Sequence, residues 1–316
     1  MHTLHTLAPI ILLLSLGALL TRIRFIGRRF IGELSKLVFW VCLPALMLRS
    51  VASAEYPGEQ TLPLITVMLL GTFLLVFLSW GVALLIKLPR KSIGTFIQSS
   101  FRGNLAYIGI PVIANSIQYL PDDLEQELLQ TALLTMAAVT AVYNILAVIV
   151  LRAGQGHIHL GTTRLVLRSI LTNPLLLACM AGLILARLHW HFPLFLDRTL
   201  ASLGAASVPT ALLCTGGSLA TVDLKNSRLS ICLAALLKIA IFPLLIFGLC
   251  LTMGLTGINL QMALLLAASP AAAASYIMAR QMGGDEALAS GAIAVSTVFS
   301  GASLALVLIF TSAAGG

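Results

Sequence analysis

Two cationic side chains, Arg102 and Lys238, lie inside long apolar stretches of the sequence, where a charge is costly. Arg102 follows Lys91 by eleven residues, which is roughly 16 Å along a helix that rises about 1.5 Å per residue. All eleven Asp and Glu residues fall in predicted loops or at the ends of predicted spans. Because a cation inside a membrane needs a partner, these two must meet a backbone carbonyl, a water-filled cavity or an anionic substrate. The pattern favours binding of a small organic anion and disfavours cation transport through buried carboxylates.

Both cations also have a simpler role open to them. Arg102 could anchor to a lipid phosphate, although reaching the headgroups from half-depth would strain its side chain. A purely structural network inside the protein is the alternative for Arg102 and for Lys238 alike.

An amide and a few weaker polar groups complete the candidate substrate-binding set. Asn104 is the strongest candidate because its amide can both donate and accept hydrogen bonds. A serine in a membrane helix more often bonds to the neighbouring backbone than to a ligand. Ser269 is therefore a weaker candidate, as are Asn144 and Tyr276.

The composition indicates that these residues belong to an integral membrane protein. The chain of 316 residues is 59% hydrophobic and only 9% charged, whereas about a quarter of the residues in a soluble domain are charged. The first apolar run is expected to be retained as a span, because Arg22 and Arg24 follow it instead of preceding it. None of the six histidines stands at metal-ligand spacing from an acid, so no metal site and no cofactor is expected.

The apolar segments predict an all-helical protein with ten membrane spans, since about 20 residues are needed to cross the hydrocarbon core. Seven windows of that size carry no charge, at residues 3–21, 61–86, 128–151, 170–186, 199–222, 257–279 and 287–312. Three more contain charged residues, at residues 34–52, 92–119 and 229–256.

Lysine and arginine are divided unequally between alternate loops. One set of loops holds fourteen of these residues, and the other set holds only Arg49, Arg187 and Arg198. The positive-inside rule places the rich set in the cytoplasm, so both termini are expected outside the cytoplasmic membrane. The net charge of +8 then matches the anionic inner leaflet, and no nucleic-acid partner is expected.

The ten spans are predicted to form two inverted five-span repeats, at residues 1–155 and 156–316. Five spans per half force the halves to insert in opposite directions. At a constant spacing of 165 residues, rare residue types in spans one and two match those in spans six and seven: Pro9 with Pro174, Gly17 with Gly182, Arg22 with Arg187, and Pro44 with Pro209.

Spans four and nine are predicted to be broken helices that cross. Span four carries Gly109, Ile110 and Pro111 near its middle, and span nine carries Pro270. A proline removes a backbone donor, and freed backbone groups inside a bilayer must find partners in protein or water. Two ordinary proline kinks are the alternative. Interrupted segments at corresponding places in two halves nevertheless point to a transporter's binding site.

The sequence disfavours the other classes of membrane protein. An intramembrane protease would need a buried base, a pair of buried acids or an H-E-x-x-H motif, and the chain offers none of these in its spans. It is therefore not expected to be an enzyme. A sensor built on a transporter fold is the remaining alternative. Because no GxxxxGK[ST] motif occurs, transport would draw on a gradient.

Motifs along nearly the whole chain resemble the auxin efflux carrier family, in its bacterial branch. They are Asn104 followed by "GIP" at 109–111, "LTNPLLLACMAGLIL", "LGAASVPTALLCTGGSL", "LKIAIFPLL" and "ASPAAAASYIMARQMGGDEALASGAIAVSTVFS". The resemblance implies the fold that this family shares with bile-acid-type sodium symporters. Spans one, two, six and seven would form a scaffold domain, and spans three to five and eight to ten a mobile core transport domain.

The same resemblance implies a secondary active transporter with alternating access of the elevator or rocking type. The expected substrates are small organic anions, as mono- or dicarboxylates, carried across a bacterial inner membrane. A sodium-coupled symporter of a different amphipathic anion is the alternative. The coupling ion is expected to be H+ or Na+, with Lys238 as the residue for charge and coupling, and a homodimer would form through the scaffold domain.

Overall fold

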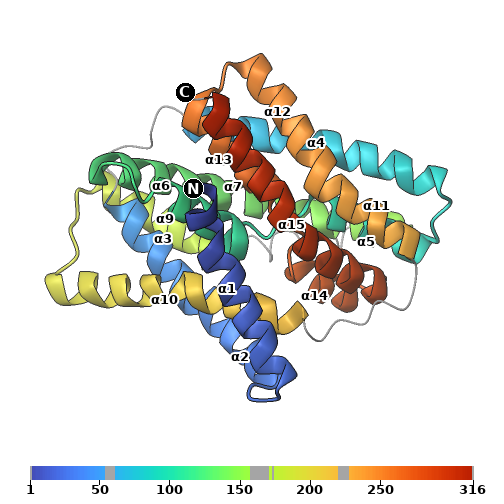
Figure 1. The fold of residues 1–316 in the computed structure, drawn as a ribbon, viewed down its shortest axis with the longest axis horizontal. Coiled ribbons are helices and arrows are strands. Elements are labelled where there is room, and N and C mark those ends of the chain that lie inside the picture. The colour runs from blue at the N-terminus through green and yellow to red at the C-terminus, as the bar shows by residue number, and fades with distance from the viewer. Residues whose placement is uncertain (1, 54–60, 157–170, 173, 220–227, 315–316) are drawn as a thin grey trace. The chain divides into compact units, whose positions relative to one another are not determined.

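The computed structural model describes residues 2–53, 61–156, 171–172, 174–219 and 228–314 (Figure 1). In these parts all regular structure is helical, and the only strand-like pairing is one isolated bridge. Six segments are long and apolar enough to cross a bilayer: Arg29–Ala52, Thr61–Leu85, Asp122–Gly154, Leu194–Gly217, Arg228–Met253 and Glu286–Thr311. Four apolar helices are shorter: Ile11–Arg22, Leu105–Ile117, Pro174–Arg187 and Gly257–Ala268. The prediction of an all-helical, multi-pass membrane protein is confirmed.

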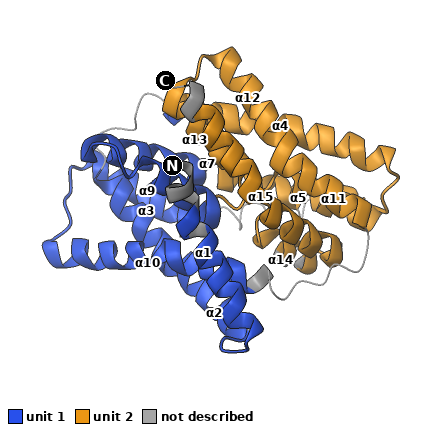
Figure 2. Ribbon diagram, viewed as in Figure 1, with its two compact units in different colours: residues 1–61, 106–138, 171–221 blue, residues 62–105, 139–170, 222–316 orange. Residues whose placement is uncertain are grey.

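The helices group into two compact units, and each unit takes helices from both halves of the chain (Figure 2). Unit 1 comprises Met1–Thr61, Ala106–Ala138 and Leu171–Thr221. Unit 2 comprises Leu62–Leu105, Val139–Ile170 and Val222–Gly316.

Unit 1 is a bundle whose helices approach one another through glycines. It contains α1 (His2–Arg22), α2 (Arg28–Leu37), the π-helical turn η1 (Val38–Cys42), α3 (Leu43–Ala52), most of the π-helical turn η2 (Leu105–Gly109), α6 (Ile110–Ile117), the first part of α7 (Asp122–Gly154), α9 (Pro174–Arg187) and α10 (Leu194–Leu219). A methyl group at Gly17 of α1 would overlap the α10 backbone, and one at Gly216 of α10 would overlap the α1 backbone. A methyl group at Gly182 of α9 would lie 2.9 Å from Cβ of Val51 on α3. Small residues permit this close packing between membrane helices.

Unit 2 holds the remaining helices around a well-packed core. They are α4 (Thr61–Leu85), α5 (Arg90–Phe101), the second part of α7, α11 (Arg228–Leu236), the π-helical turn η3 (Leu237–Ile241), α12 (Phe242–Met253), α13 (Gly257–Ala268), α14 (Ala274–Gln281) and α15 (Glu286–Ala314). Phe96, Phe101 and Phe242 are fully buried between them. Large apolar side chains on α4 such as Phe77 are instead exposed, as expected of a surface that faces lipid.

Proline is accommodated in three places by a π-helical turn that ends two residues before it. The turns η1, η2 and η3 precede Pro44, Pro111 and Pro243 respectively. Proline cannot donate a backbone hydrogen bond. In η1 and η3 the residue just before the proline donates to the carbonyl five residues back, and the helix continues.

This arrangement corrects the predicted position of the first break. Helix α5 ends at Phe101, Arg102 has an extended ψ of 98°, and helical structure resumes at Leu105. The interruption therefore lies at residues 102–104, and Gly109, Ile110 and Pro111 lie beyond it in continuous helix because η2 accommodates the proline. The second interruption runs from Ser269, with a ψ of 138°, to Ala273 and includes Pro270.

Candidate functional site

The two interrupted segments are paired through their backbones inside unit 2. The N–H of Asn104 donates to the carbonyl of Pro270 at 2.7 Å, and the N–H of Ala272 donates to the carbonyl of Arg102 at 2.9 Å. Gly103 and Ala271 lie opposite each other as an antiparallel bridge between these bonds. Backbone groups released by one interruption are thus satisfied by the other, as a dry environment requires. We call residues 102–104 and 269–273 the crossing.

Gly103 leaves little free space beside it at the crossing. A Cβ atom there would lie 3.0 Å from Leu105 Cδ2 and 3.3 Å from Lys238 Nζ. The glycine thus lets the two segments and the lysine approach one another closely.

The side chain of Arg102, the first residue of the crossing, is buried and forms hydrogen bonds with neutral groups. Arg102 is the residue that follows α5, and it is only 6% exposed. Nη2 donates to Oδ1 of Asn144 on α7, and Nη1 donates to Sδ of Met278 on α14. The ion pairs within the described part of the chain involve Lys36 and Arg49, not Arg102. The guanidinium charge therefore has no carboxylate to neutralise it there.

A second buried polar pair continues the same face of α5. Gln98 precedes Arg102 by four residues, which places both on one side of the helix, and its Nε2 donates to the carbonyl of Ser275 at 2.9 Å. The Oε1 atom of Gln98 and the Oγ atom of Ser275 are buried with no hydrogen-bond partner among the described residues. Sequence reasoning missed Gln98, although an amide one turn before a buried arginine was a usable signal. It also missed Met278, for which no polar signal exists.

The remaining predicted substrate-binding residues occupy different environments. Asn104 lies in the crossing and is 8% exposed. Ser269 is fully buried, and its Oγ donates to the carbonyl of Leu265 one turn earlier at 3.0 Å. The hydroxyl of Tyr276 donates to Oε2 of Glu286 at 3.2 Å, an exposed contact. The described contacts thus join Asn144 to Arg102 but do not join Tyr276 to either.

Lys238 reaches the crossing from η3. The residue has no exposed surface, and its Nζ donates to the carbonyl of Ala267 in the last turn of α13. The ammonium nitrogen also lies 4.6 Å from the centre of the Phe242 ring, within the range of a cation–π interaction.

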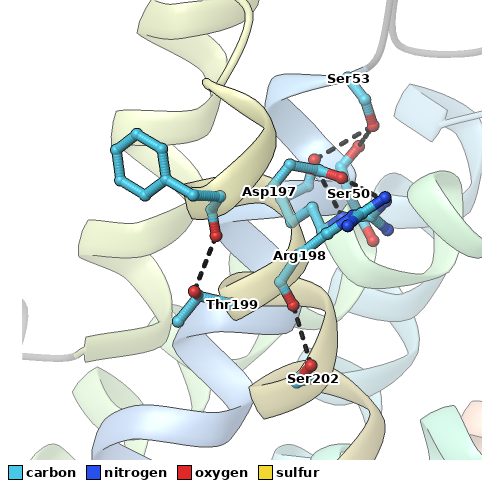
Figure 3. Close-up of polar contacts among 8 residues, drawn as sticks. Ser50, Ser53, Asp197, Arg198, Thr199 and Ser202 are labelled. Atoms are coloured by element: carbon cyan, nitrogen blue, oxygen red, sulfur yellow. Dashed lines mark hydrogen bonds and ion pairs between the residues drawn. The ribbon is translucent and has the colours of Figure 1, made fainter.

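A contrasting arginine is found within unit 1, where α3 and α10 are joined by an ion pair. Arg49 Nε donates to Asp197 Oδ1 at 2.7 Å, and Nη2 donates to Oδ2 at 3.1 Å. Figure 3 shows Asp197 beside Ser50 of α3 and Ser53, the residue that follows α3. The hydroxyl of Ser53 donates to the backbone carbonyls of Arg49 and Ser50. Sequence reasoning did not pair these residues, because their separation of 148 positions leaves no local signal.

Among the described residues, no group of three or more His, Cys, Asp or Glu side chains is placed so that it could hold a metal ion. Several residues used in the sequence analysis lie outside the described residues. They are Glu55, Glu59, His157, His159, Arg164, Arg168, Asp223 and Lys225.

Comparison with known proteins gives matches along nearly the full length. A family model described as "Membrane transport protein" matches residues 2–308. An "Uncharacterized transporter" of Methanothermobacter thermautotrophicus is 26% identical over 314 residues, which cover 97% of each chain. A "Putative malonate transporter" of Rhizobium meliloti is 25% identical over 300 residues, which cover 92% of this chain and 90% of the relative.

Proposed function

Because the chain belongs to the membrane transport protein family, the family of the auxin efflux carriers, we propose that it is a secondary active transporter of small organic anions. Its substrates are mono- or dicarboxylates, and it carries them across a bacterial cytoplasmic membrane. The family is one of transporters and not of enzymes. The relative whose name refers to malonate supports a dicarboxylate as the first substrate to test.

The observation that carries this proposal is the environment of Arg102. A buried guanidinium beside the crossing is bonded to an amide and a thioether, and these neutral partners leave its charge uncompensated within the described residues. A bound carboxylate would supply the compensating negative charge through a bidentate contact with the planar guanidinium. Asn104, in the crossing two residues further on, supplies an amide that can turn toward the same anion.

The proposed fold has ten spans in two inverted repeats, and the packing of unit 1 supports it. Gly17 of α1 and Gly182 of α9 occupy matching positions in the two predicted repeats. Gly17 packs against α10, and Gly182 packs against α3. Each thus contacts a helix from the other half of the chain, as a pseudo-two-fold axis relating the halves would require.

We propose alternating access by movement of unit 2 relative to unit 1, and the division of the chain into two units supports it. Unit 1 contains predicted spans one, two, six and seven, which are those of the expected scaffold domain, and unit 2 contains the crossing. Residues 106–138 depart from the expected division, because they group with unit 1 and not with the rest of spans four and five. Outward-facing termini, H+ or Na+ as the coupling ion, and a homodimer through unit 1 complete the proposal.

Transport by purified protein in liposomes tests the function. Radiolabelled malonate, other dicarboxylates and monocarboxylates are supplied under imposed proton or sodium gradients, with empty liposomes as the blank. We expect saturable uptake of at least one carboxylate and no uptake of organic cations. Movement of organic cations without carboxylates would overturn the assignment, and a protein that binds carboxylates but moves none would be a sensor.

A further inference from the structure

The second interruption releases a carbonyl that an ordinary helix would keep bonded. In a continuous helix the carbonyl of Ala267 would accept from the N–H of Ala271. Here the Ala271 N–H donates instead to Oγ of Ser296 on α15 at 3.0 Å. Pro270 has no N–H to offer, and the neighbouring carbonyl of Leu266 accepts from Ser269 at 3.4 Å. The Ala267 carbonyl is therefore left without its helical partner inside a fully buried region.

The ammonium group of Lys238 takes the place of the missing N–H donor. Its Nζ donates to the Ala267 carbonyl at the C-terminal end of α13, where a helix carries partial negative charge. The same ammonium group lies against Gly103 of the other interrupted segment. One side chain therefore contacts both halves of the crossing.

No carboxylate balances this lysine in the described part of unit 2. The only acids there are Asp285 and Glu286. Asp285 accepts hydrogen bonds from Oγ of Ser92 at 2.7 Å and from the N–H of Leu288 at 3.0 Å. Glu286 accepts from the hydroxyl of Tyr276. The ammonium is thus stabilised by the carbonyl, by the helix end and by the Phe242 ring.

We infer that Lys238 is a tethered cation that completes the broken end of α13 and leaves no need for a monovalent metal ion there. The crossing is consequently complete without Na+, and transport does not require it. The independence of transport from Na+ rests on the proposed function, whereas the role of Lys238 in the crossing does not. Lys238 is accordingly a positioning residue, which acts through the backbone that it holds.

Thermal unfolding of the purified full-length protein tests the crossing directly. For the unaltered protein, the midpoint in sodium, potassium or lithium chloride should equal that in choline chloride within about 1 °C at constant ionic strength. A saturable rise of the midpoint with Na+ would overturn the inference, because it would reveal a site for the metal ion. This measurement needs no variant and no substrate.

Variants with chemical rescue give the second test. Lys238→Ala should lower the midpoint by about 5 °C or more, and n-propylammonium, which matches the atoms removed, should restore at least half of the loss. Tetramethylammonium has no N–H donor and should restore nothing. Lys238→Met fills the volume without the charge and should remain destabilised, whereas Lys87→Ala removes an exposed lysine and should leave the midpoint unchanged. A Lys238→Met protein as stable as the parent would overturn the inference.

Uptake in liposomes separates this inference from the proposed function. Carboxylate uptake by the unaltered protein should be equal in sodium and choline media, within twofold. A strict requirement for Na+ would refute the inference while leaving carboxylate transport intact. If no carboxylate is transported at all, the proposed function fails, and the unfolding measurements still decide the role of Lys238.

Discussion

Arg49 and Arg102 differ in burial and in how their charges are compensated. Arg49, in unit 1, is bonded through two nitrogens to the carboxylate of Asp197, and both side chains are about one-third exposed or more. Arg102, in unit 2, is buried and, among the described residues, is bonded to an amide and a thioether. The first charge is already neutralised and joins two helices. The second charge is paired with no acid in the described part of the chain, which leaves it available to an anion.

Replacing Arg102 or Asn104 should have the largest effects. Arg102→Gln keeps a polar side chain but removes the charge, so the initial rate of carboxylate uptake should fall about 100-fold, since hydrogen bonds to charged groups contribute about 1.5–3 kcal/mol each. Arg102→Lys keeps the charge without the planar fork and should retain an intermediate rate. Uptake that is unchanged in Arg102→Gln would remove this residue from the site.

Asn104→Ala should abolish measurable uptake while the protein stays folded. The backbone N–H that pairs Asn104 with Pro270 is kept in this variant, so the crossing should survive the loss of the side chain. Size-exclusion profile and thermal midpoint report the fold, and radiolabelled uptake reports the function. Ser269→Ala is the matched control, because the hydroxyl of Ser269 donates to the carbonyl of Leu265 in the preceding helix, and this variant should transport at a rate within threefold of the parent.

Asn144→Asp converts the environment of Arg102 into one like that of Arg49. A carboxylate would then stand where the amide oxygen now accepts from the guanidinium and would compete with the substrate anion for it. We expect uptake to fall about tenfold through a higher KM. Asn144→Ala, which adds no charge, should affect KM less than the aspartate does; the reverse order would refute competition for the charge.

Asp197→Asn should have the smallest effect. Partly exposed ion pairs contribute about 1 kcal/mol or less, so the thermal midpoint should fall by about 1–3 °C and the uptake rate should stay within twofold of the parent. A loss of uptake comparable to that of Arg102→Gln would show that the pairing of α3 with α10 takes part in transport.

Hydropathy predicted where the helices lie but not where they are interrupted or how they accommodate proline. The window 61–86 became α4 from Thr61 to Leu85, because an uncharged run of that length has no alternative in a bilayer. The break in the fourth predicted span was placed at Pro111, whereas it lies at 102–104. Its position depends on Ala271 and Lys238, which are far away in the sequence, and residue types near Pro111 carry no sign of the π-helical turn.

The contacts of the candidate site were predictable only in part. A charge in an apolar run singled out Arg102 and Lys238, since few residue types are so costly there. Asn144 was a weaker candidate and turned out to bond Arg102 directly. Met278 looked like any other apolar residue of its helix, and Tyr276 forms its hydrogen bond with Glu286. Which neighbours a buried cation meets is decided by tertiary packing, which hydropathy does not contain.

The backbone pairing at the crossing also has a consequence for how the protein is made. Asn104 leaves the ribosome well before Pro270, its hydrogen-bond partner, and closing so long a loop is slow. During translation the N-terminal half must therefore wait in the bilayer with these backbone groups lacking their final partners. We expect nascent chains that stop before residue 272 to be recognised by membrane quality control and degraded.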